Sequence, residues 1–235
     1  MIFKNWRKIA FILAMIGVTQ YILLCSIAMI FYPGGNVINP NTPGYTFLLN
    51  QMSDLGRTES LSGEKNHISM ILFMIAIIFV NIGFSPFYLA MASFFSKKRV
   101  FCYLAAISEL LSAIFGISIA FFPVDQFPTA HLSVTLMFSI FFTVALCLIV
   151  SPIISNGAYP NRYGYVVIFY ASILAVYIIM VSMGVNLSSK QGYMILATGQ
   201  KIIIYSGFIC IFVLAFGAYL RYNKINTDDS TFQVR

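Results

Sequence analysis

Residues 67–95, HISMILFMIAIIFVNIGFSPFYLAMASFF, run for 29 positions without an Asp, Glu, Lys or Arg. An α-helix rises about 1.5 Å per residue, so a helix of this length exceeds the roughly 30 Å of a membrane's hydrocarbon core. The stretch also lacks the charged face of a soluble amphipathic helix. It therefore predicts a helix that crosses a membrane.

The rest of the chain has the same character. Of its 235 residues, 60% are hydrophobic and 9% are charged, and the mean hydropathy is +0.87, whereas soluble domains are about 25% charged. Alternating strands of a membrane β-barrel are absent from the sequence. We predict an all-α polytopic membrane protein with one six-helix domain, residues 1–222, and a polar cytoplasmic tail, residues 223–235. The predicted helices are 9–32, 67–95, 100–122, 132–154, 165–185 and 201–220.

The positive charges are distributed unevenly over the connections between these helices. In a soluble protein the net charge of +7 would suggest a nucleic acid partner, but in a membrane protein it indicates topology, and we expect no nucleic acid. Six helices place ten basic residues on one side and four on the other, which predicts cytoplasmic N- and C-termini in the cell membrane. The ten are Lys4, Arg7, Lys8, Lys97, Lys98, Arg99, Arg162, Arg221, Lys224 and Arg235; the four are Arg57, Lys65, Lys190 and Lys201.

The first outer connection, residues 33–66, is far longer than a usual loop and is a candidate for function. Thr42 and Pro43 are suited to the start of a helix, an apolar run follows from Tyr45 to Met52, and Gly56 ends the pattern. We expect a short interfacial helix on the outer leaflet.

Polar residues recur on the outer side in four separate parts of the chain, at residues 50–57, 125–131, 186–190 and 200–201. If the helices close around them, Asp54, Asp125, His131 and Lys201 converge at one cluster, with Asn50, Ser53 and Gln200 beside it. The alternative is that these are ordinary residues of a membrane interface, and that Asp54 only orders its own turn with Arg57.

His131 is the candidate general base of this cluster. Thr129 is a plausible N-cap, which puts His131 in the first turn of its helix, where the helix dipole favours a neutral imidazole. Asp125 is expected to orient the other ring nitrogen. Asp54, Asp125 and His131 are also the one candidate zinc set, but the whole chain has two histidines, and we predict no metal and no cofactor.

Glu109 lies about 14 Å into its helix, where an ionised carboxylate costs on the order of 2.5–3.5 kcal/mol. Ser112 follows it, and Gln20 and Asn81 sit at comparable depths in other helices. Two interpretations stay open for these intramembrane polar residues. They form a proton or ion relay, or they are hydrogen-bonded contacts that fix helix packing.

These short motifs, taken in order, resemble one family. Asn50-x-x-Ser53-Asp54-Leu55-Gly56, Phe122-Pro123-x-Asp125, His131 and a polar-basic pair at residues 200–201 are similar to the prokaryotic six-pass family catalogued as domain of unknown function 998. The resemblance covers residues 9–220, and the Ser-Asp-x-Gly stretch more distantly resembles the Frag/DRAM/Sfk family, which is linked to lipid remodelling. It implies six helices and a shared outer polar cluster, and it supplies no reaction. Lys201 stands where an arginine is expected.

The leading hypothesis is an outward-facing polar cavity that binds or modifies a lipid or another amphiphile. Asp54, Asp125 and His131 would be its catalytic group if it is an enzyme, and Asn50, Ser53, Gln200 and Lys201 would bind substrate. A proton-coupled transporter centred on Glu109 is the second hypothesis. A non-catalytic subunit, with other membrane subunits as partners, is the third.

Overall fold

A computed structural model describes residues 5–155, 159–183 and 189–232, with side chains as far as residue 224. The described chain is helical, and strand-like pairing is confined to two isolated bridges in the connection 32–66. The helices, in chain order, are α1 (Trp6–Phe31), η2 (Met52–Gly56), α2 (His67–Met91), η3 (Ala92–Phe94), α3 (Arg99–Phe121), α4 (Pro128–Ser155), α5 (Arg162–Ser182) and α6 (Lys190–Phe232).

Six of these helices are long and apolar enough to cross a membrane, which confirms the predicted six-pass, all-α class. The first five agree with the predicted ranges to within four residues, although the predicted end at residue 185 lies outside the described residues. The sixth was predicted wrongly. It begins at Lys190 rather than 201, and it continues to Phe232, through most of the predicted tail.

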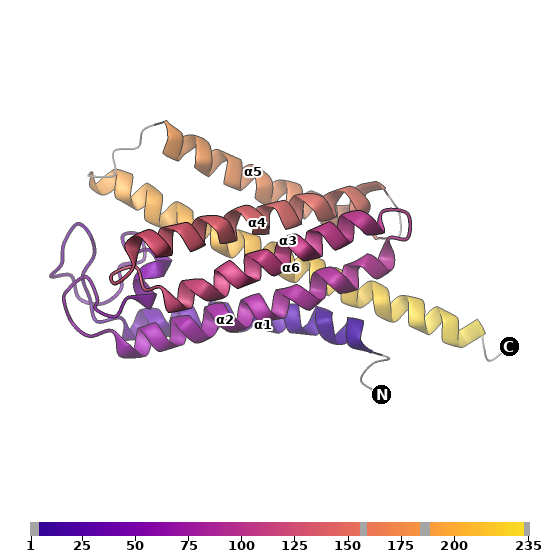
Figure 1. The fold of residues 1–235 in the computed structure, drawn as a ribbon, viewed down its shortest axis with the longest axis horizontal. Helices are drawn as coiled ribbons and strands as arrows, with labels where there is room; N and C mark the ends of the chain where they lie inside the picture. The colour runs from indigo at the N-terminus through magenta and orange to yellow at the C-terminus, as the bar shows by residue number, and fades with distance from the viewer. Residues whose placement is uncertain (1–4, 156–158, 184–188, 233–235) are drawn as a thin grey trace.

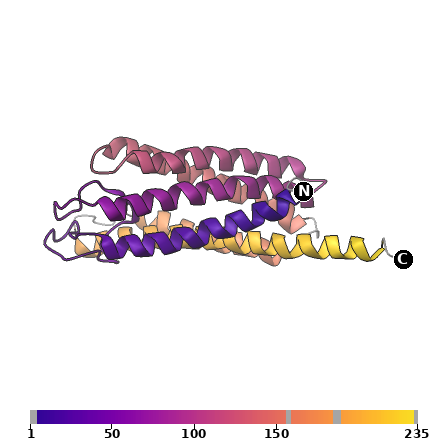
Figure 2. The same ribbon diagram turned by 90° about the horizontal axis from the view of Figure 1, so that it is seen from below.

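The six long helices run along one axis (Figure 1), and both ends of the chain lie at the same end of the bundle. The connection 32–66 lies at the opposite end, and the turned view in Figure 2 keeps this separation. We call the two ends the terminal end and the loop end. The α3–α4 connection, the end of α5 and the start of α6 also lie at the loop end, so the described residues predicted for the outer side share one end of the bundle.

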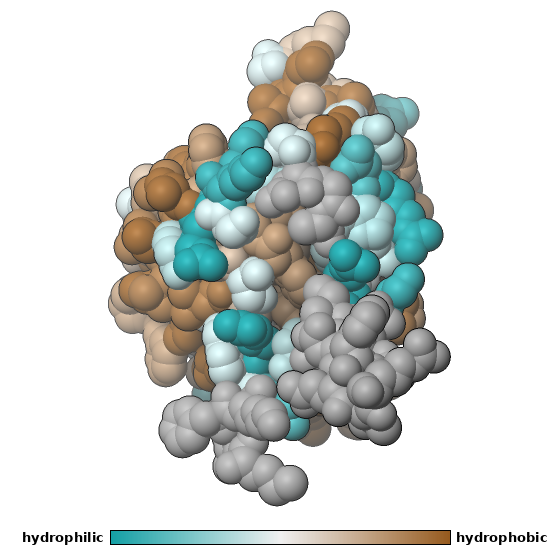
Figure 3. Space-filling model, turned by 90° about the vertical axis from the view of Figure 1, so that its right-hand side faces the viewer, coloured by the Kyte–Doolittle hydropathy of each residue, from teal (hydrophilic) through white to brown (hydrophobic). Residues whose placement is uncertain are grey.

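Hydrophilic residues gather at the terminal end, while hydrophobic residues cover the flanks of the bundle (Figure 3). Basic residues stand at the helix starts on this end, namely Arg7, Lys8, Arg99 and Arg162. Two members of the predicted basic set, Lys4 and Arg235, lie outside the described residues. The apolar flanks are what a hydrocarbon environment requires of a helix bundle.

Small residues bring α1 and α2 close together. A Cβ atom added to Gly83 would lie 2.8 Å from the Leu13 carbonyl oxygen, and one added to Gly17 would lie 3.4 Å from the α2 backbone. Beside this contact, Gln20 Nε2 donates a hydrogen bond of 2.9 Å to the Ala76 carbonyl. Close backbone packing and polar contacts between helices are the usual sources of stability within a membrane. Gln20 therefore fixes helix packing.

Two serines join α3 to α4. Ser108 Oγ donates to the Phe141 carbonyl at 2.9 Å, and Ser112 Oγ donates to the Phe138 carbonyl at 3.1 Å. Glu109, between them, is fully buried, and neither of its carboxyl oxygens has a hydrogen-bond partner among the described residues. The hydrogen-bonded contact expected of this region is thus made by the serines and not by Glu109.

Asn81 serves the packing of α2 against α3. Its Nδ2 donates to the Ile77 carbonyl of its own helix at 2.7 Å, and a Cβ atom added to Gly116 would lie 2.4 Å from its Oδ1. That oxygen has no hydrogen-bond partner among the described residues. Asn81 is therefore held by close packing on one side and by its own helix on the other.

The predicted interfacial helix in the connection 32–66 is wrong. At its expected start, the Thr42 carbonyl accepts a hydrogen bond of 2.7 Å from the Gly35 N–H, and Pro43 pairs with Gly34 in one of the two bridges. Asn36 Oδ1 accepts from two further backbone N–H groups at 2.9 and 3.0 Å. These bonds give the backbone an alternative to a helix. The one helical segment described here is η2, and all five of its residues are buried.

Candidate functional site

Asn50 is the centre of the folded connection and is fully buried. Its Nδ2 donates to the Gly35 carbonyl at 2.8 Å and to Asp54 Oδ2 at 3.2 Å, and its Oδ1 accepts from the Thr46 N–H at 2.8 Å. An asparagine amide has two hydrogens to donate, and both are used here. Asn50, predicted to bind substrate, therefore holds the loop together.

Asp54 caps its own short helix. Its Oδ2 accepts the Gln51 N–H at 2.8 Å in addition to the Asn50 amide, and its Oδ1 lies 4.0 Å from Arg57 Nη1. Burial raises the pKa of Asp54, and the hydrogen bonds from Gln51 and Asn50 oppose that rise. Asp54 thus orders its own turn together with Arg57, as one of the two interpretations of the sequence predicts.

Asp125 does not orient His131 as expected, because its carboxylate binds the connection 32–66. It accepts the Thr58 hydroxyl at 2.5 Å, the Thr58 N–H at 3.0 Å and the Glu59 N–H at 3.1 Å. Burial alone would raise the pKa of Asp125, but these donors together lower it below the ordinary value of 3.8. Asp125 therefore ties the α3–α4 turn to the loop.

We expect Asp125→Asn to lower the stability of the folded protein by about 1 kcal/mol at pH 6, because an amide accepts these donors less strongly than a carboxylate. A lowered carboxyl pKa stabilises the fold above its ordinary value of 3.8, and this contribution is lost as the pH falls through the lowered pKa. The difference between wild type and variant should therefore disappear in strong acid. Thermal melting in detergent at a series of pH values measures it. The exposed Glu64→Gln is the control, and a difference that is independent of pH would contradict this role.

His131 is held by a backbone carbonyl. Its Nδ1 lies 2.7 Å from the Phe122 carbonyl oxygen, which can only accept, so Nδ1 carries a proton. In the neutral ring Nε2 then keeps its lone pair. The predicted N-cap, Thr129, already lies inside α4, which begins at Pro128, and His131 is in its first turn.

Lys201 is 1% exposed and lies within α6, not at its start as predicted. Its ammonium donates to the Asn50 carbonyl and, at 3.1 Å, to the Ala197 carbonyl. It also lies 5.5 Å from the ring centroid of Tyr45 and 5.2 Å from that of Phe47. A cation over aromatic faces is favourable. The lysine predicted to meet an anionic head group thus has its charge placed against the loop.

Gln200 connects the loop to α6, because its Oε1 accepts the Met52 N–H at 2.9 Å. The hydrogen bond of Ser53 stays within the loop, since its Oγ donates to Gln51 Oε1 at 3.3 Å. The bond to Met52 gives the polar side chain of Gln200, which lies inside α6, a partner in the loop, and it places the Gln200 amide next to η2.

The predicted four-residue cluster is therefore divided by its hydrogen bonds. Asp54, Asp125 and Lys201 each bind the connection 32–66, while His131 binds the α3–α4 turn. Among the described residues, no three His, Cys, Asp or Glu side chains are grouped so that they could hold a metal ion. The candidate zinc set of the sequence is thus not assembled.

A hollow of about 550 Å³, which we call the central cavity, lies beneath η2. Every one of the six long helices contributes to its wall, together with Met52 and Ser53 of η2. His131, Thr135 and Gln200 line it with Ser53, and the Thr135 hydroxyl has no hydrogen-bond partner among the described residues. The site that the structure assembles is therefore this cavity, with polar groups from the loop, α4 and α6.

Sequence reasoning missed the part played by Thr135, Tyr45 and Phe47. Thr135 follows His131 by four residues, so helical spacing places both on one face. Tyr45 and Phe47 were interpreted as the apolar face of an interfacial helix. No pattern in the sequence joins them to Lys201, which lies more than 150 residues further along the chain.

Six helices that are long and apolar enough to cross a membrane indicate a multi-pass membrane protein. Comparison with known proteins adds no relative, because no family model, no curated protein and no solved structure matches the chain. The resemblance to the six-pass family stays a prediction.

Proposed function

We propose that the protein binds a lipid or another single amphiphile in the central cavity, with the loop end on the outer side of the cell membrane and both termini in the cytoplasm. The orientation is supported by the basic residues at the terminal end, since positive charge is enriched on the cytoplasmic side of membrane proteins. In this orientation, membrane lipids are the molecules with the most direct access to the cavity.

The proposal rests on one observation: the wall of the cavity changes from polar to apolar along its length. Ser53, His131 and Gln200 line its loop end, and deeper in the bundle the wall is built mostly from apolar side chains such as Ile140 and Phe208. Such a gradient matches a molecule with a polar head and a hydrocarbon chain. Apolar pockets with a few placed polar groups are typical of ligand sites.

The depth of the cavity fits a hydrocarbon chain. His131 and Val144 of α4 both line it, and this stretch of helix rises about 20 Å. One leaflet of a membrane is about 15 Å of hydrocarbon, half of the roughly 30 Å core. A chain bound in the cavity would therefore lie alongside those of the surrounding leaflet.

The cavity also has a side that faces lipid. Leu136 and Ile140 of α4 and Ile178 of α5 line it, yet these side chains are 53%, 44% and 55% exposed. Residues that are both lining and exposed mark the mouth of a hollow. A lipid can thus enter sideways between α4 and α5, without passing through the loop.

His131 is the residue we assign to the polar head. Its Nδ1 is fixed by the Phe122 carbonyl, so Nε2 is the nitrogen that can accept a hydrogen bond, or a proton if the ligand is also a substrate. Ser53 and Gln200 supply a hydroxyl and an amide beside it. Asp54 and Asp125 act on this site indirectly, by holding the loop that covers it.

We expect Thr135→Trp to weaken binding of oleoyl lysophosphatidylcholine about tenfold, the equivalent of 1.4 kcal/mol, because the indole would occupy the cavity. Native mass spectrometry of the protein titrated with this lipid measures the change. Ser133→Trp is the matched control, since Ser133 is exposed on the same helix and does not line the cavity. Equal binding by the two variants would show that the cavity is not the site.

A second candidate function, proton-coupled transport, is favoured by one observation. Glu109 is a fully buried carboxyl group whose oxygens have no hydrogen-bond partner among the described residues, so packing does not explain its presence. Intramembrane ionisable residues commonly mark proton or ion pathways.

Glu109→Gln should abolish a pH-driven proton flux into proteoliposomes, followed with a pH-sensitive dye, while leaving the melting temperature nearly unchanged. The second expectation follows because the glutamate has no hydrogen bond to lose. Ser112→Ala is a control for which the reverse result is expected. It removes the hydrogen bond to the Phe138 carbonyl, so it should lower the melting temperature without changing the proton flux. If the wild type shows no proton flux, proton-coupled transport is excluded as the function.

A further inference from the structure

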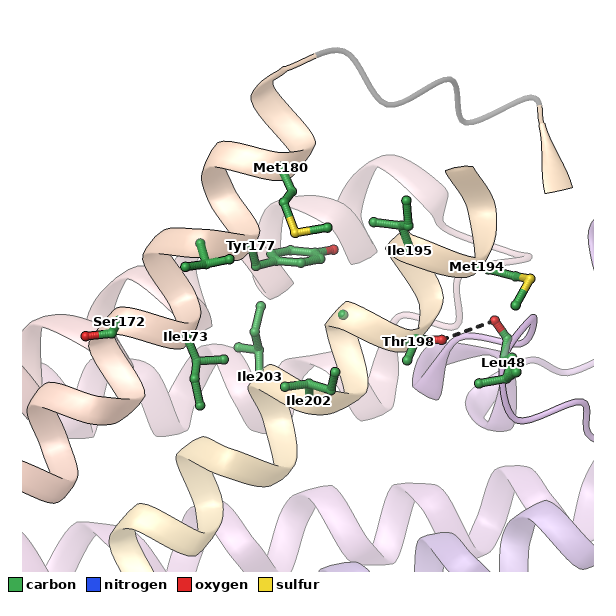
Figure 4. A pocket seen from close by; sticks show the side chains of 12 residues that line it. Leu48, Ser172, Ile173, Tyr177, Met180, Met194, Ile195, Thr198, Ile202 and Ile203 are labelled. Atoms are coloured by element: carbon green, nitrogen blue, oxygen red, sulfur yellow. Dashed lines mark hydrogen bonds between the residues drawn. The ribbon is translucent and has the colours of Figure 1, made fainter. Parts of the chain in front are cut away.

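A second hollow, which we call the side groove, lies between α5 and α6 and measures about 630 Å³. Apart from Ser172, Tyr177 and Thr198, its wall is built from aliphatic side chains, methionines and a glycine, and Leu48 of the loop closes one end. In Figure 4, Ile173, Tyr177 and Met180 project from α5, and Ile202 and Ile203 from α6, toward the space between the two helices. Because α5 and α6 are membrane-spanning helices, what adjoins the groove is lipid.

The side groove and the central cavity lie at the same depth in the bundle. Both are lined by the same stretch of α5, residues 170–180, so they lie alongside each other and not one above the other. The α5 residues of the central cavity are Tyr170, Leu174, Tyr177 and Ile178, and those of the side groove are Ser172, Ile173, Val176, Tyr177 and Met180.

Tyr177 is the partition between the two hollows. With Ile203 of α6, it lines both of them. Its ring lies on Gly199, where an added Cβ atom would be 2.3 Å from ring atom Cε2, and its hydroxyl donates to the Leu196 carbonyl at 3.4 Å. In Figure 4 the ring reaches from α5 across to α6. A glycine at position 199 is what allows an aromatic side chain to close the gap.

The loop covers both hollows. Leu48 lines the side groove, and its carbonyl accepts a hydrogen bond of 3.5 Å from Thr198 Oγ1. Met52 and Ser53 line the central cavity. Polar groups therefore stand at the loop end of each hollow, at the level where a lipid's head group and glycerol would lie.

We propose that the two hollows together bind one two-chain lipid, with one hydrocarbon chain in the central cavity and the other in the side groove, on either side of Tyr177. This inference rests on the proposed function and narrows its ligand from amphiphiles in general to lipids with two chains. Two adjacent hollows at equal depth, each closed by the same loop, match two chains that leave one head group in parallel.

The test uses the full chain in detergent and compares dioleoyl phosphatidylcholine with oleoyl lysophosphatidylcholine by native mass spectrometry. The wild type should retain one two-chain lipid or two one-chain lipids. Val176→Trp, which fills the side groove, should weaken retention of the two-chain lipid at least tenfold and reduce the one-chain lipids from two to one. Ile179→Trp is the matched control, because both positions are 56% exposed on α5 but Ile179 lines neither hollow.

Leu174→Trp, which lines only the central cavity, separates this inference from the proposed function. If Leu174→Trp abolishes binding while Val176→Trp behaves like Ile179→Trp, the protein binds a single chain and the two-chain inference is overturned. If the wild type retains neither lipid, the proposed function itself fails. Two one-chain lipids in the wild type and one in Val176→Trp support the inference.

Discussion

Lys201→Glu is expected to release the loop from the bundle and to destabilise the fold by about 3–5 kcal/mol, the range for breaking a buried charged contact. The lysine ammonium lies against two carbonyl oxygens and over the faces of Tyr45 and Phe47. Carbonyl oxygens carry a partial negative charge, and the faces of aromatic rings have a negative electrostatic potential. A carboxylate in the same place is therefore repelled by each of them. With 1% of the residue exposed, water does not screen this repulsion.

Thermal melting in detergent and trypsin cleavage after Arg57 measure the effect, since an open loop exposes that bond. Lys190→Glu makes the same charge change at an exposed position of the same helix and should be nearly neutral. Lys201→Met keeps the aliphatic stem but loses the charged hydrogen bonds, at about 1.5–3 kcal/mol, together with the cation–π contacts to Tyr45 and Phe47. Should Lys201→Met and Lys201→Glu both melt like the wild type, Lys201 does not hold the loop.

Asn50→Ala is expected to cost about 3 kcal/mol or more, because it removes three hydrogen bonds in a fully buried place. The Gly35 carbonyl and the Thr46 N–H each lose a partner, and Asp54 loses a donor. An unsatisfied buried polar group costs about 1–3 kcal/mol. For a chain of this size 1 kcal/mol lowers the melting temperature by about 2–4 °C, so a fall of roughly 6–12 °C is expected.

Asn41→Ala is the matched control, an exposed asparagine in the same connection whose side chain has no hydrogen bond among the described residues. Differential scanning fluorimetry with a thiol- or tryptophan-based signal can compare the two. A fall for Asn50→Ala no larger than that for Asn41→Ala would mean that the loop is held by its other contacts. Binding of lysophosphatidylcholine should fall with loop stability, since the loop covers the central cavity.

The six helices could be predicted because each follows from a local property. A run of apolar residues in hydrocarbon forms a helix, because a helix satisfies its own backbone hydrogen bonds. The same argument fails at residues 190–200, which the prediction placed before the sixth helix, although Thr198 and Gln200 lie inside it. Their hydrogen bonds go to Leu48 and Met52, which are distant in sequence, so no local pattern shows that the helix continues.

The loop and the site were predicted less well for the same reason. Residue types at the loop end were identified, but the partners of Asp54, Asp125 and Lys201 depend on how residues 33–66 fold, and glycines and asparagines there set the path. His131 was expected to pair with Asp125, yet the carbonyl of Phe122, nine residues before it in the chain, satisfies it. A hollow such as the central cavity has no sequence signature at all, since it is defined by side chains from every helix.

The bond between Lys201 and Asn50 has a consequence for the order of synthesis. Residue 50 leaves the ribosome long before residue 201, and chains emerge at about 5–20 residues per second. For several seconds the loop therefore lies at the membrane surface without α6, the helix whose Lys201 binds it. A nascent chain that stops before α6 therefore lacks this contact and the part of the cavity wall that α6 supplies. The loop can therefore close through this contact only after residue 201 has been synthesised and α6 has taken its place in the bundle.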